Sequence, residues 1–141
     1  FALQIPLISM DTLAVLAAQF TGSSQRIVAV LDARRDEVYI GVYDSSGKTI
    51  MPAQPQVITP GYFQQSVFAV QDLVFVGSGA AKCREIDPVL GAVYHGEVWP
   101  HAAQMAQQVW DSYQASLFED VAYFEPDYLK EFTVNKPQKK S

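Results

Sequence analysis

The sequence predicts an α/β fold, a mixed sheet of about five strands with flanking helices. Three strand-like segments separated by turn residues fill the first half of the chain, which favours consecutive antiparallel strands. Strand-like and helical segments then alternate, which favours parallel strands joined by helices. The chain has 141 residues, of which 49% are hydrophobic and 18% charged, and this is the size and composition of one folded domain.

The first predicted element is a helix over about residues 10–20. Ser9 is the expected N-cap, and Asp11 lies in the first turn, where an acidic side chain favours the positive end of the helix dipole. Gly22 ends the helix. Its apolar residues recur at helical spacing, namely Leu13, Leu16, Ala17 and Phe20.

Two runs of β-branched and aromatic residues, at 27–31 and 38–43, predict a hairpin. A cluster of turn residues then leads to a third strand near 49–51. Pro52 and Pro55 interrupt this third segment. We therefore expect either an edge strand or two short pieces, of which Val57-Ile58 is the second.

The second half of the chain alternates between helices and strands. Thr59-Pro60 supplies an N-cap and a proline at the first helical position, which predicts a short helix as far as Val67. The apolar run 73–76 is typical of a buried parallel strand, and it leads through a glycine loop into a helix. A short strand at 92–95 follows. A last helix opens at Pro100 and keeps its apolar residues on one face, namely Ala102, Met105, Ala106, Val109, Trp110 and Tyr113.

The C-terminal part is rich in aromatic residues and then becomes basic. The aromatic residues between Tyr113 and Phe132 either pack this segment or form an exposed docking patch. Residues 136–141 are expected to be a flexible basic tail. The folded domain is therefore predicted over residues 1–135.

Charge and cysteine content limit the classes of function. The chain carries 10 Lys and Arg against 15 Asp and Glu, a net charge of −5, which disfavours a grip on nucleic acid by this chain alone. The single cysteine cannot form an internal disulfide, and no leader or apolar stretch of about 18 residues is seen. We expect a cytoplasmic protein with no membrane partner. Because the chain opens on Phe1, we also expect a fragment of a longer protein.

The loop Gly77-Ser78-Gly79, with Lys82 one turn further on, is the candidate phosphate loop. It lacks the third glycine of a dinucleotide fingerprint and the Gly-Lys-Ser/Thr ending of a P-loop. A plain tight turn and an anion-binding loop both remain open.

The predicted hairpin tip is densely charged. Asp32, Arg34, Arg35 and Glu37 are the candidates for a site that faces a partner or a nucleotide. Solvation of a surface turn is the other interpretation, although the stretch lacks the Asn-Gly or Asp-Gly pair of a two-residue turn.

No catalytic residue and no metal ligand is assigned. His95 and His101 stand six residues apart without a metal-binding spacing, and Cys83 has no neighbour that would mark it as a nucleophile. The sequence contains no Gly-x-Ser-x-Gly elbow.

Several segments together resemble the TsaB (YeaZ) family, bacterial accessory proteins for threonylcarbamoyladenosine synthesis on tRNA. The resemblance covers nearly the whole chain in order. It rests on the segment Ile5-Pro6-Leu7-Ile8, the hairpin Leu31 to Tyr39, the loop Gly77-Ser78-Gly79-Ala80, Pro100-His101-Ala102, and Pro126-Asp127-Tyr128-Leu129-Lys130. It implies the RNase H-like half of an actin, sugar kinase and Hsp70-type (ASKHA) fold. Residues 1–135 would be the C-terminal domain of a two-domain protein whose N-terminal domain is absent.

The resemblance also implies a function. The chain would be a non-catalytic scaffold or activating subunit that binds a TsaD-like catalytic subunit, with a TsaE-like ATPase as a further partner. ATP and metal would be bound by the partner subunit, and none by this chain alone. It would meet tRNA only through the complex, and a homodimer is a further expectation. Older descriptions of the family as glycoproteases find no support in these residues, so this chain is not expected to be an enzyme by itself.

Two other hypotheses come from different classes. One is a small-molecule kinase of the same ASKHA fold, with nucleotide bound at Gly77-Ser78-Gly79. The other is a structural module for homodimerisation.

Overall fold

The computed structural model describes residues 5–23 and 25–129. The predicted basic tail at 136–141, the end of the predicted domain and Phe132 lie outside these residues. The element order within them is α1 (Thr12–Ala17), the 3₁₀ turn η1 (Ala18–Phe20), β1 (Arg26–Asp32), β2 (Glu37–Tyr43), β3 (Thr49–Val57), the 3₁₀ turns η2 (Tyr62–Gln64) and η3 (Ser66–Phe68), β4 (Leu73–Val76), α2 (Ala80–Ile86), β5 (Val93–His95) and α3 (Ala102–Gln114).

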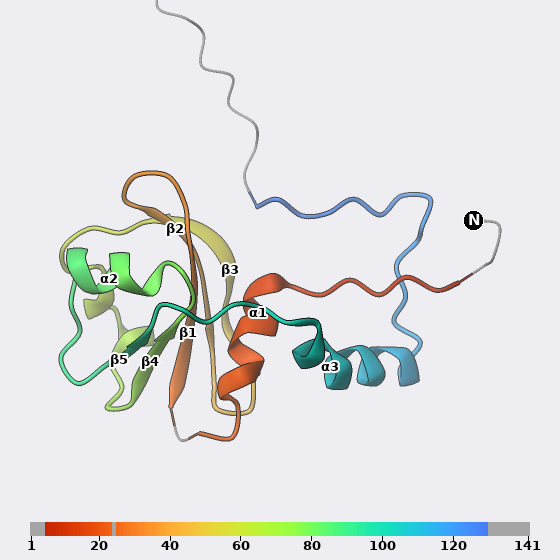
Figure 1. Cartoon of the computed structure of the whole chain (residues 1–141), viewed down its shortest axis with the longest axis horizontal. Coiled ribbons are helices and arrows are strands. Elements are labelled where there is room, and N and C mark those ends of the chain that lie inside the picture. The colour runs from red at the N-terminus through yellow and green to blue at the C-terminus, as the bar shows by residue number, and fades with distance from the viewer. Residues whose placement is uncertain (1–4, 24, 130–141) are drawn as a thin grey trace, which may run out of the picture.

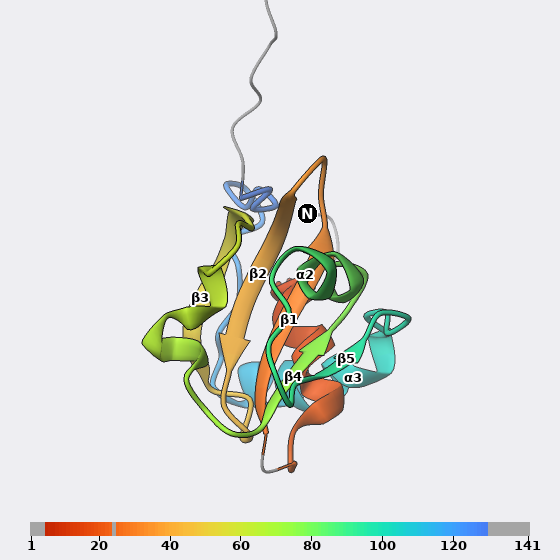
Figure 2. The same ribbon diagram turned by 90° about the vertical axis from the view of Figure 1, so that its left-hand side faces the viewer.

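The strands form a mixed sheet of five strands in the order β3-β2-β1-β4-β5. β1 pairs with β2, and β2 with β3, in antiparallel fashion, whereas β4 and β5 continue the sheet in parallel with β1. Helices flank this sheet on both sides (Figures 1 and 2). The fold class predicted from the sequence is confirmed.

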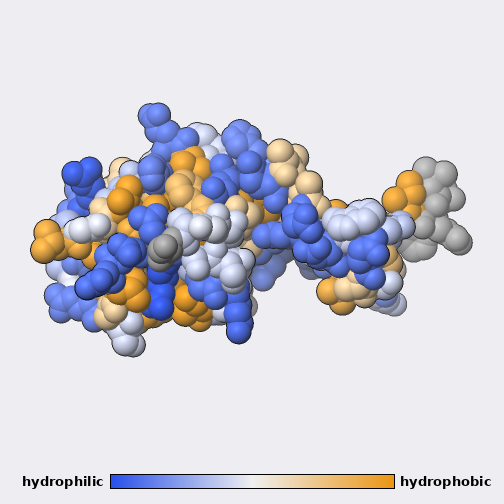
Figure 3. Space-filling model, turned by 90° about the horizontal axis from the view of Figure 1, so that it is seen from below, coloured by the Kyte–Doolittle hydropathy of each residue, from blue (hydrophilic) through white to orange (hydrophobic). Residues whose placement is uncertain are grey.

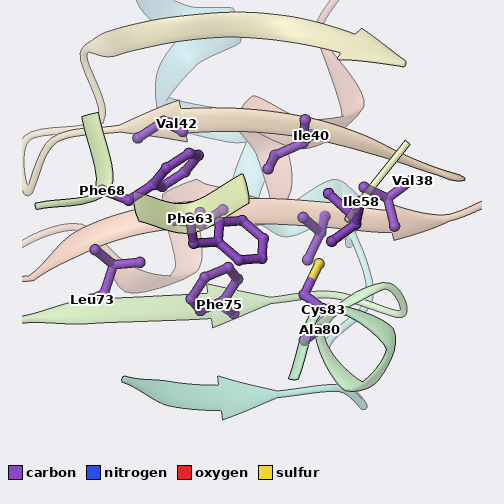
Figure 4. Close-up of a cluster of buried hydrophobic side chains, with 12 residues drawn as sticks. Val38, Ile40, Val42, Ile58, Phe63, Phe68, Leu73, Phe75, Ala80 and Cys83 are labelled. Carbon is purple, nitrogen blue, oxygen red and sulfur yellow. The ribbon is translucent and has the colours of Figure 1, made fainter. Parts of the chain in front are cut away.

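Alternate residues of the central strand feed two hydrophobic cores. Ile27 and Ala29 face α1, together with Leu13 and Leu16 of that helix. Val28 and Val30 point to the opposite face of the sheet. There they pack with Phe63, Phe68 and Phe75, and with Ala80 and Cys83 of α2 (Figure 4). Because both faces are covered, β1 is a continuous apolar run, as expected for a central strand.

The third strand is one edge strand of nine residues rather than two pieces. Its pairing with β2 shifts register between Ile40 and Val42 and again at Tyr43. Pro52 and Pro55 are tolerated because an edge strand has a partner on one side only, so half of its backbone groups need no ladder bond.

Two local predictions are wrong. The helix predicted from Thr59-Pro60 is a pair of 3₁₀ turns, because Gly61 has a φ of 85° and the Asp87 carboxylate accepts hydrogen bonds from the backbone N–H groups of Gly61 and Phe63 at 2.9 and 2.8 Å. The N-cap of α1 is Asp11, whose carboxylate accepts from the Ala14 N–H at 2.9 Å. Ser9 instead donates to Glu119.

Candidate functional site

The candidate site lies at the edge of the sheet where β1 and β4 end. These two strands are parallel neighbours, so the segments that follow them meet at the same edge. The β1–β2 hairpin follows β1, and the loop Gly77-Ser78-Gly79 follows β4. The fold therefore brings together the two segments that the sequence analysis singled out separately.

Ser78 and Gly79 bond directly to the end of β1. The Ser78 hydroxyl accepts a hydrogen bond from the Asp32 N–H at 3.0 Å, and the Gly79 N–H donates to the Val30 carbonyl at 3.2 Å. The loop and the base of the hairpin thus form one hydrogen-bonded unit.

Lys82 braces the hairpin from α2. Its ammonium donates to the carbonyl oxygens of Ala33 at 2.8 Å and Glu37 at 3.1 Å, and it forms an ion pair with the Asp32 carboxylate. The Lys82 side chain is 18% exposed and that of Asp32 is 52% exposed. Lys82 therefore spans both sides of the hairpin base, and an anion at the loop would compete with three oxygens for it.

The glycines of this loop are required by its close approach to β1. Gly77 has a φ of 107°, and a Cβ there would lie 2.3 Å from the Val30 carbonyl oxygen and 2.5 Å from a Leu16 methyl group. A Cβ on Gly79 would lie 3.1 Å from the backbone of Leu31.

Most backbone donors of the loop and of Ala80, which follows it, are used inside the chain. The Gly77 N–H donates to His95 and that of Ala80 to Gly77, at 2.9 and 3.0 Å, while Gly79 donates to Val30. A phosphate in this loop would have to displace these contacts. Tight packing thus accounts for the glycine pattern.

The hairpin tip carries two exposed arginines. Arg35 adopts a left-handed conformation with a φ of 57°, and the turn is closed by hydrogen bonds from Ala33 N–H to Glu37 O and from Glu37 N–H to Arg34 O, at 3.1 and 3.3 Å. The Ile58 N–H donates to the Asp36 carbonyl at 2.8 Å, which ties the tip to the end of β3. Neither guanidinium makes a hydrogen bond or ion pair with another residue among 5–23 and 25–129.

Beside this hairpin lies a groove that the sequence analysis did not predict. It has a volume of about 550 Å³ and runs between the start of α1, Leu31 and Tyr39 on the strands, and the segment Phe124–Leu129. The aromatic residues of the C-terminal segment, for which a docking patch was one interpretation, were the one feature of the sequence that pointed to this groove. Asp11, which lines the groove, accepts a hydrogen bond from the Tyr43 hydroxyl at 3.4 Å. Burial, followed by the charge of Asp11, raises the pKa of Tyr43.

The remaining candidate groups do not assemble into a reactive centre within the described part of the chain. Burial raises the pKa of Cys83 to about 12, so the thiol is protonated at neutral pH and belongs to the core. No group of three or more His, Cys, Asp or Glu side chains able to hold a metal is present among the described residues. No helix in the described ranges is long and apolar enough to cross a membrane.

Comparison with known proteins gives a family and a structural relationship. The family model described as TsaD, tRNA N6-adenosine threonylcarbamoyltransferase, matches residues 1–140. A solved structure of YeaZ from Pseudomonas aeruginosa is similar, with a TM-score of 0.73 and 26% sequence identity. So is a crystal structure of an uncharacterised protein with similarity to peptidase YeaZ from the same organism, with a TM-score of 0.72 and 25% identity. Each similarity covers 92% of this chain but 62% of the solved chain. No curated protein matches.

Proposed function

Because this chain belongs to the TsaD family of tRNA N6-adenosine threonylcarbamoyltransferases and is similar in structure to YeaZ, we propose that it acts in the threonylcarbamoyl modification of tRNA. Its role is that of a non-catalytic subunit that binds and activates a TsaD-like catalytic subunit. In this proposal residues 1–135 are the C-terminal RNase H-like half of a two-domain protein. ATP and metal are held by the catalytic partner, and a TsaE-like ATPase completes the set.

The observation that carries this proposal is the braced hairpin, whose Arg34 and Arg35 make no hydrogen bond or ion pair with another described residue. Lys82, Ser78 and Ile58 fix the base and tip of the hairpin by hydrogen bonds. Holding the loop in one conformation before binding reduces the entropy that association costs. Such an element is suited to recognition rather than to chemistry.

The chemistry of the tip indicates the kind of surface that it meets. Arg34 and Arg35 present planar guanidinium groups, which pair with carboxylates or phosphates in a bidentate manner. The tip is not positive overall, because Asp32, Asp36 and Glu37 outnumber the two arginines, so recognition here rests on guanidinium geometry rather than on net charge. A carboxylate-bearing face on a partner fits that geometry. We assign that face to the catalytic subunit.

Reconstitution of the modification tests the proposal. Unmodified tRNA is incubated with threonine, bicarbonate, ATP, a threonylcarbamoyl-AMP synthase, and TsaD and TsaE homologues, with and without the full-length parent of this chain, and its nucleosides are then analysed. Threonylcarbamoyladenosine is expected to form only when the parent protein is present. If omitting the parent protein changes nothing, the accessory role is refuted.

A matched pair of variants tests the hairpin. The change Arg34→Glu with Arg35→Glu is expected to abolish the stimulation and the binding to TsaD. The change Lys48→Glu with Arg84→Glu reverses the same number of charges at exposed positions away from the tip, and it is expected to leave both intact. Equal loss in the two variants would show that overall charge, and not the hairpin, sets the interaction.

The kinase hypothesis has no comparable observation in its favour. The backbone N–H groups of Gly77, Gly79 and Ala80 and the ammonium of Lys82 are engaged within the chain. Titration of the chain with ATP and magnesium by calorimetry addresses this hypothesis separately from the tRNA assay.

A further inference from the structure

The strand β5 lies at one edge of the sheet, and no described strand pairs with its outer side. The Gly77 N–H donates to the His95 carbonyl at 2.9 Å, so the backbone groups of His95 point toward β4. Successive residues of a strand direct their N–H and C=O groups to opposite sides, so those of Tyr94 point to the outer edge. Tyr94 also makes no backbone hydrogen bond with a turn or loop of residues 5–23 and 25–129. β5 therefore presents a free donor and a free acceptor at this edge.

A hydrogen-bonded apolar turn stands beside this edge. The Ala92 N–H donates to the Val89 carbonyl at 3.2 Å, which closes the turn. The Val89 N–H donates to the Tyr94 hydroxyl at 2.9 Å, which ties the turn to β5. Leu90 of the turn is fully exposed, and Val93 of β5 is 42% exposed. Because the turn is already held in place, covering these two side chains costs little ordering entropy.

The turn and α2 border a hollow with a volume of about 590 Å³. Its lining consists of residues 88–94 and of Arg84 from α2. A second hollow, of about 390 Å³, shares Arg84 and Tyr94 with the first. In Figure 3, the end of the molecule where Figure 1 places α2 and β5 carries hydrophobic surface next to hydrophilic surface.

Among the described residues, Arg84 is the only basic one that lines either hollow. Its guanidinium lies over the Tyr94 ring, 5.8 Å from the ring centroid, and it makes no hydrogen bond or ion pair with another residue in the described ranges. A guanidinium pairs with a carboxylate through two parallel hydrogen bonds. Glu85 lines the second hollow and would repel a further acidic group there. The charges therefore fit one carboxylate and not a row of them.

The alternation of side chains along β5 separates the charged part of the site from the apolar part. The Tyr94 ring points to the face covered by α2, where it stacks on Phe75 with centroids 4.7 Å apart, and Arg84 lies on that face. Val93 and His95 point to the opposite face. A strand added along the outer edge would alternate in the same way. Its residue opposite Tyr94 would meet Arg84, and the residues on either side of it would pack beside Val93 and His95.

We propose that the outer edge of β5 binds an extended segment of a partner protein by strand addition. In this segment one acidic residue lies opposite Tyr94 and pairs with Arg84, and apolar residues flank it on both sides. Main-chain hydrogen bonds to Tyr94 supply affinity, and the side chains in the two hollows supply specificity. This proposal is independent of the function proposed above and uses no residue of the hairpin.

The first test measures whether the edge is free in the full-length protein. By hydrogen exchange, the Tyr94 amide is expected to exchange several-fold faster than the His95 amide, because only the latter points toward β4. If the Tyr94 amide is as protected as that of His95, another part of the protein already covers the edge and the proposal is overturned.

The second test uses a defined peptide, acetyl-Ser-Thr-Val-Glu-Val-Thr-Ser-amide, in which valines flank the glutamate. Titrated into the isotope-labelled full-length protein, it is expected to shift the Tyr94 amide resonance saturably and to slow the exchange of this amide several-fold. The same peptide with glutamine in place of glutamate should bind several-fold more weakly, and the peptide with lysine there should bind more weakly still.

A matched pair of variants tests the charge on α2. Arg84→Gln should weaken binding of the glutamate peptide several-fold and leave binding of the glutamine peptide unchanged, because only the former loses an ion pair. Glu85→Gln, at the next position of the same helix, should bind the glutamate peptide at least as tightly as the unchanged protein. Thermal unfolding shows whether both variants keep the fold.

Four results would overturn the proposal. The Tyr94 amide could show no saturable shift at millimolar peptide, the glutamate and lysine peptides could bind equally well, or Arg84→Gln and Glu85→Gln could weaken binding equally. Shifts confined to the amides of Arg34 and Arg35 would place the acidic peptide at the hairpin tip instead of at β5.

Discussion

Replacing Lys82 with methionine removes the ammonium that braces the hairpin and keeps most of the aliphatic stem. The ammonium donates to two carbonyl oxygens, at 2.8 and 3.1 Å, and pairs with Asp32. A hydrogen bond to a charged group contributes about 1.5–3 kcal/mol, whereas an ion pair with an exposed partner contributes about 0–1 kcal/mol. The Glu37 carbonyl keeps the Ala33 N–H as a donor in the variant. We therefore expect Lys82→Met to lower the free energy of unfolding by about 2 kcal/mol.

Asp32→Asn is the matched control, because it removes the charge of the partner and leaves both carbonyl hydrogen bonds in place. Asp32 is 52% exposed, so this variant should lose less than about 1 kcal/mol. Urea unfolding followed by circular dichroism measures both changes. Hydrogen exchange at the Ala33 and Glu37 amides should also accelerate in Lys82→Met. Equal losses in the two variants, or unchanged exchange at the hairpin, would refute the bracing role of Lys82.

Gly77→Ala is expected to lower the free energy of unfolding by about 3 kcal/mol or more, because its Cβ would lie 2.3 Å from the Val30 carbonyl oxygen. Gly91 has a φ of 81° and open space around it, so Gly91→Ala should lower the free energy of unfolding by about 1 kcal/mol, from backbone strain alone. Thermal unfolding ranks the two variants, and similar losses would contradict the close-packing explanation. The buried Cys83 thiol should resist iodoacetamide at pH 8 until urea unfolds the chain, and rapid native-state alkylation would contradict its burial. Burial raises the pKa values of Cys83 and Tyr43 above their ordinary 9.0 and 10.0, so the protonated forms are favoured in the folded state. The stability that the two groups contribute is present below their ordinary pKa values of 9.0 and 10.0, and it is lost as the pH rises from these values toward the raised pKa values of the folded state. In pH-dependent urea unfolding, Cys83→Ala should remove the first part of this alkaline loss, and an unchanged onset near pH 9.0 would contradict the assignment.

The strands and the helix after the glycine loop could be predicted because their signals are local. β1, β2 and β4 are runs of β-branched and aromatic residues, and hydrophobic burial on both faces of the sheet requires this composition. The helix α2 follows directly from the glycine loop that ends β4. In these segments the local preference and the tertiary environment favour the same structure.

The local errors occurred where a distant residue supplies the decisive contact. Asp87 takes the backbone donors of Gly61 and Phe63, and a helix predicted from Thr59-Pro60 becomes two 3₁₀ turns. Ser9 bonds to Glu119, which lies 110 residues away in the sequence, and leaves the N-cap of α1 to Asp11. Propensity and capping rules cannot detect partners of this kind.

The order and type of most elements, the burial of the central strand on both faces and the charged character of the hairpin follow from local sequence patterns. The contacts that those charges make depend on the folded arrangement of the strands. The parallel pairing of β1 and β4 places the hairpin beside the glycine loop, so that Lys82 braces the hairpin from another element. Arg34 and Arg35 at its tip make no ion pair within the described ranges. Spatial proximity across a sheet edge arises from strand pairing, and pairing is set by burial over the whole chain rather than by the residues at the edge.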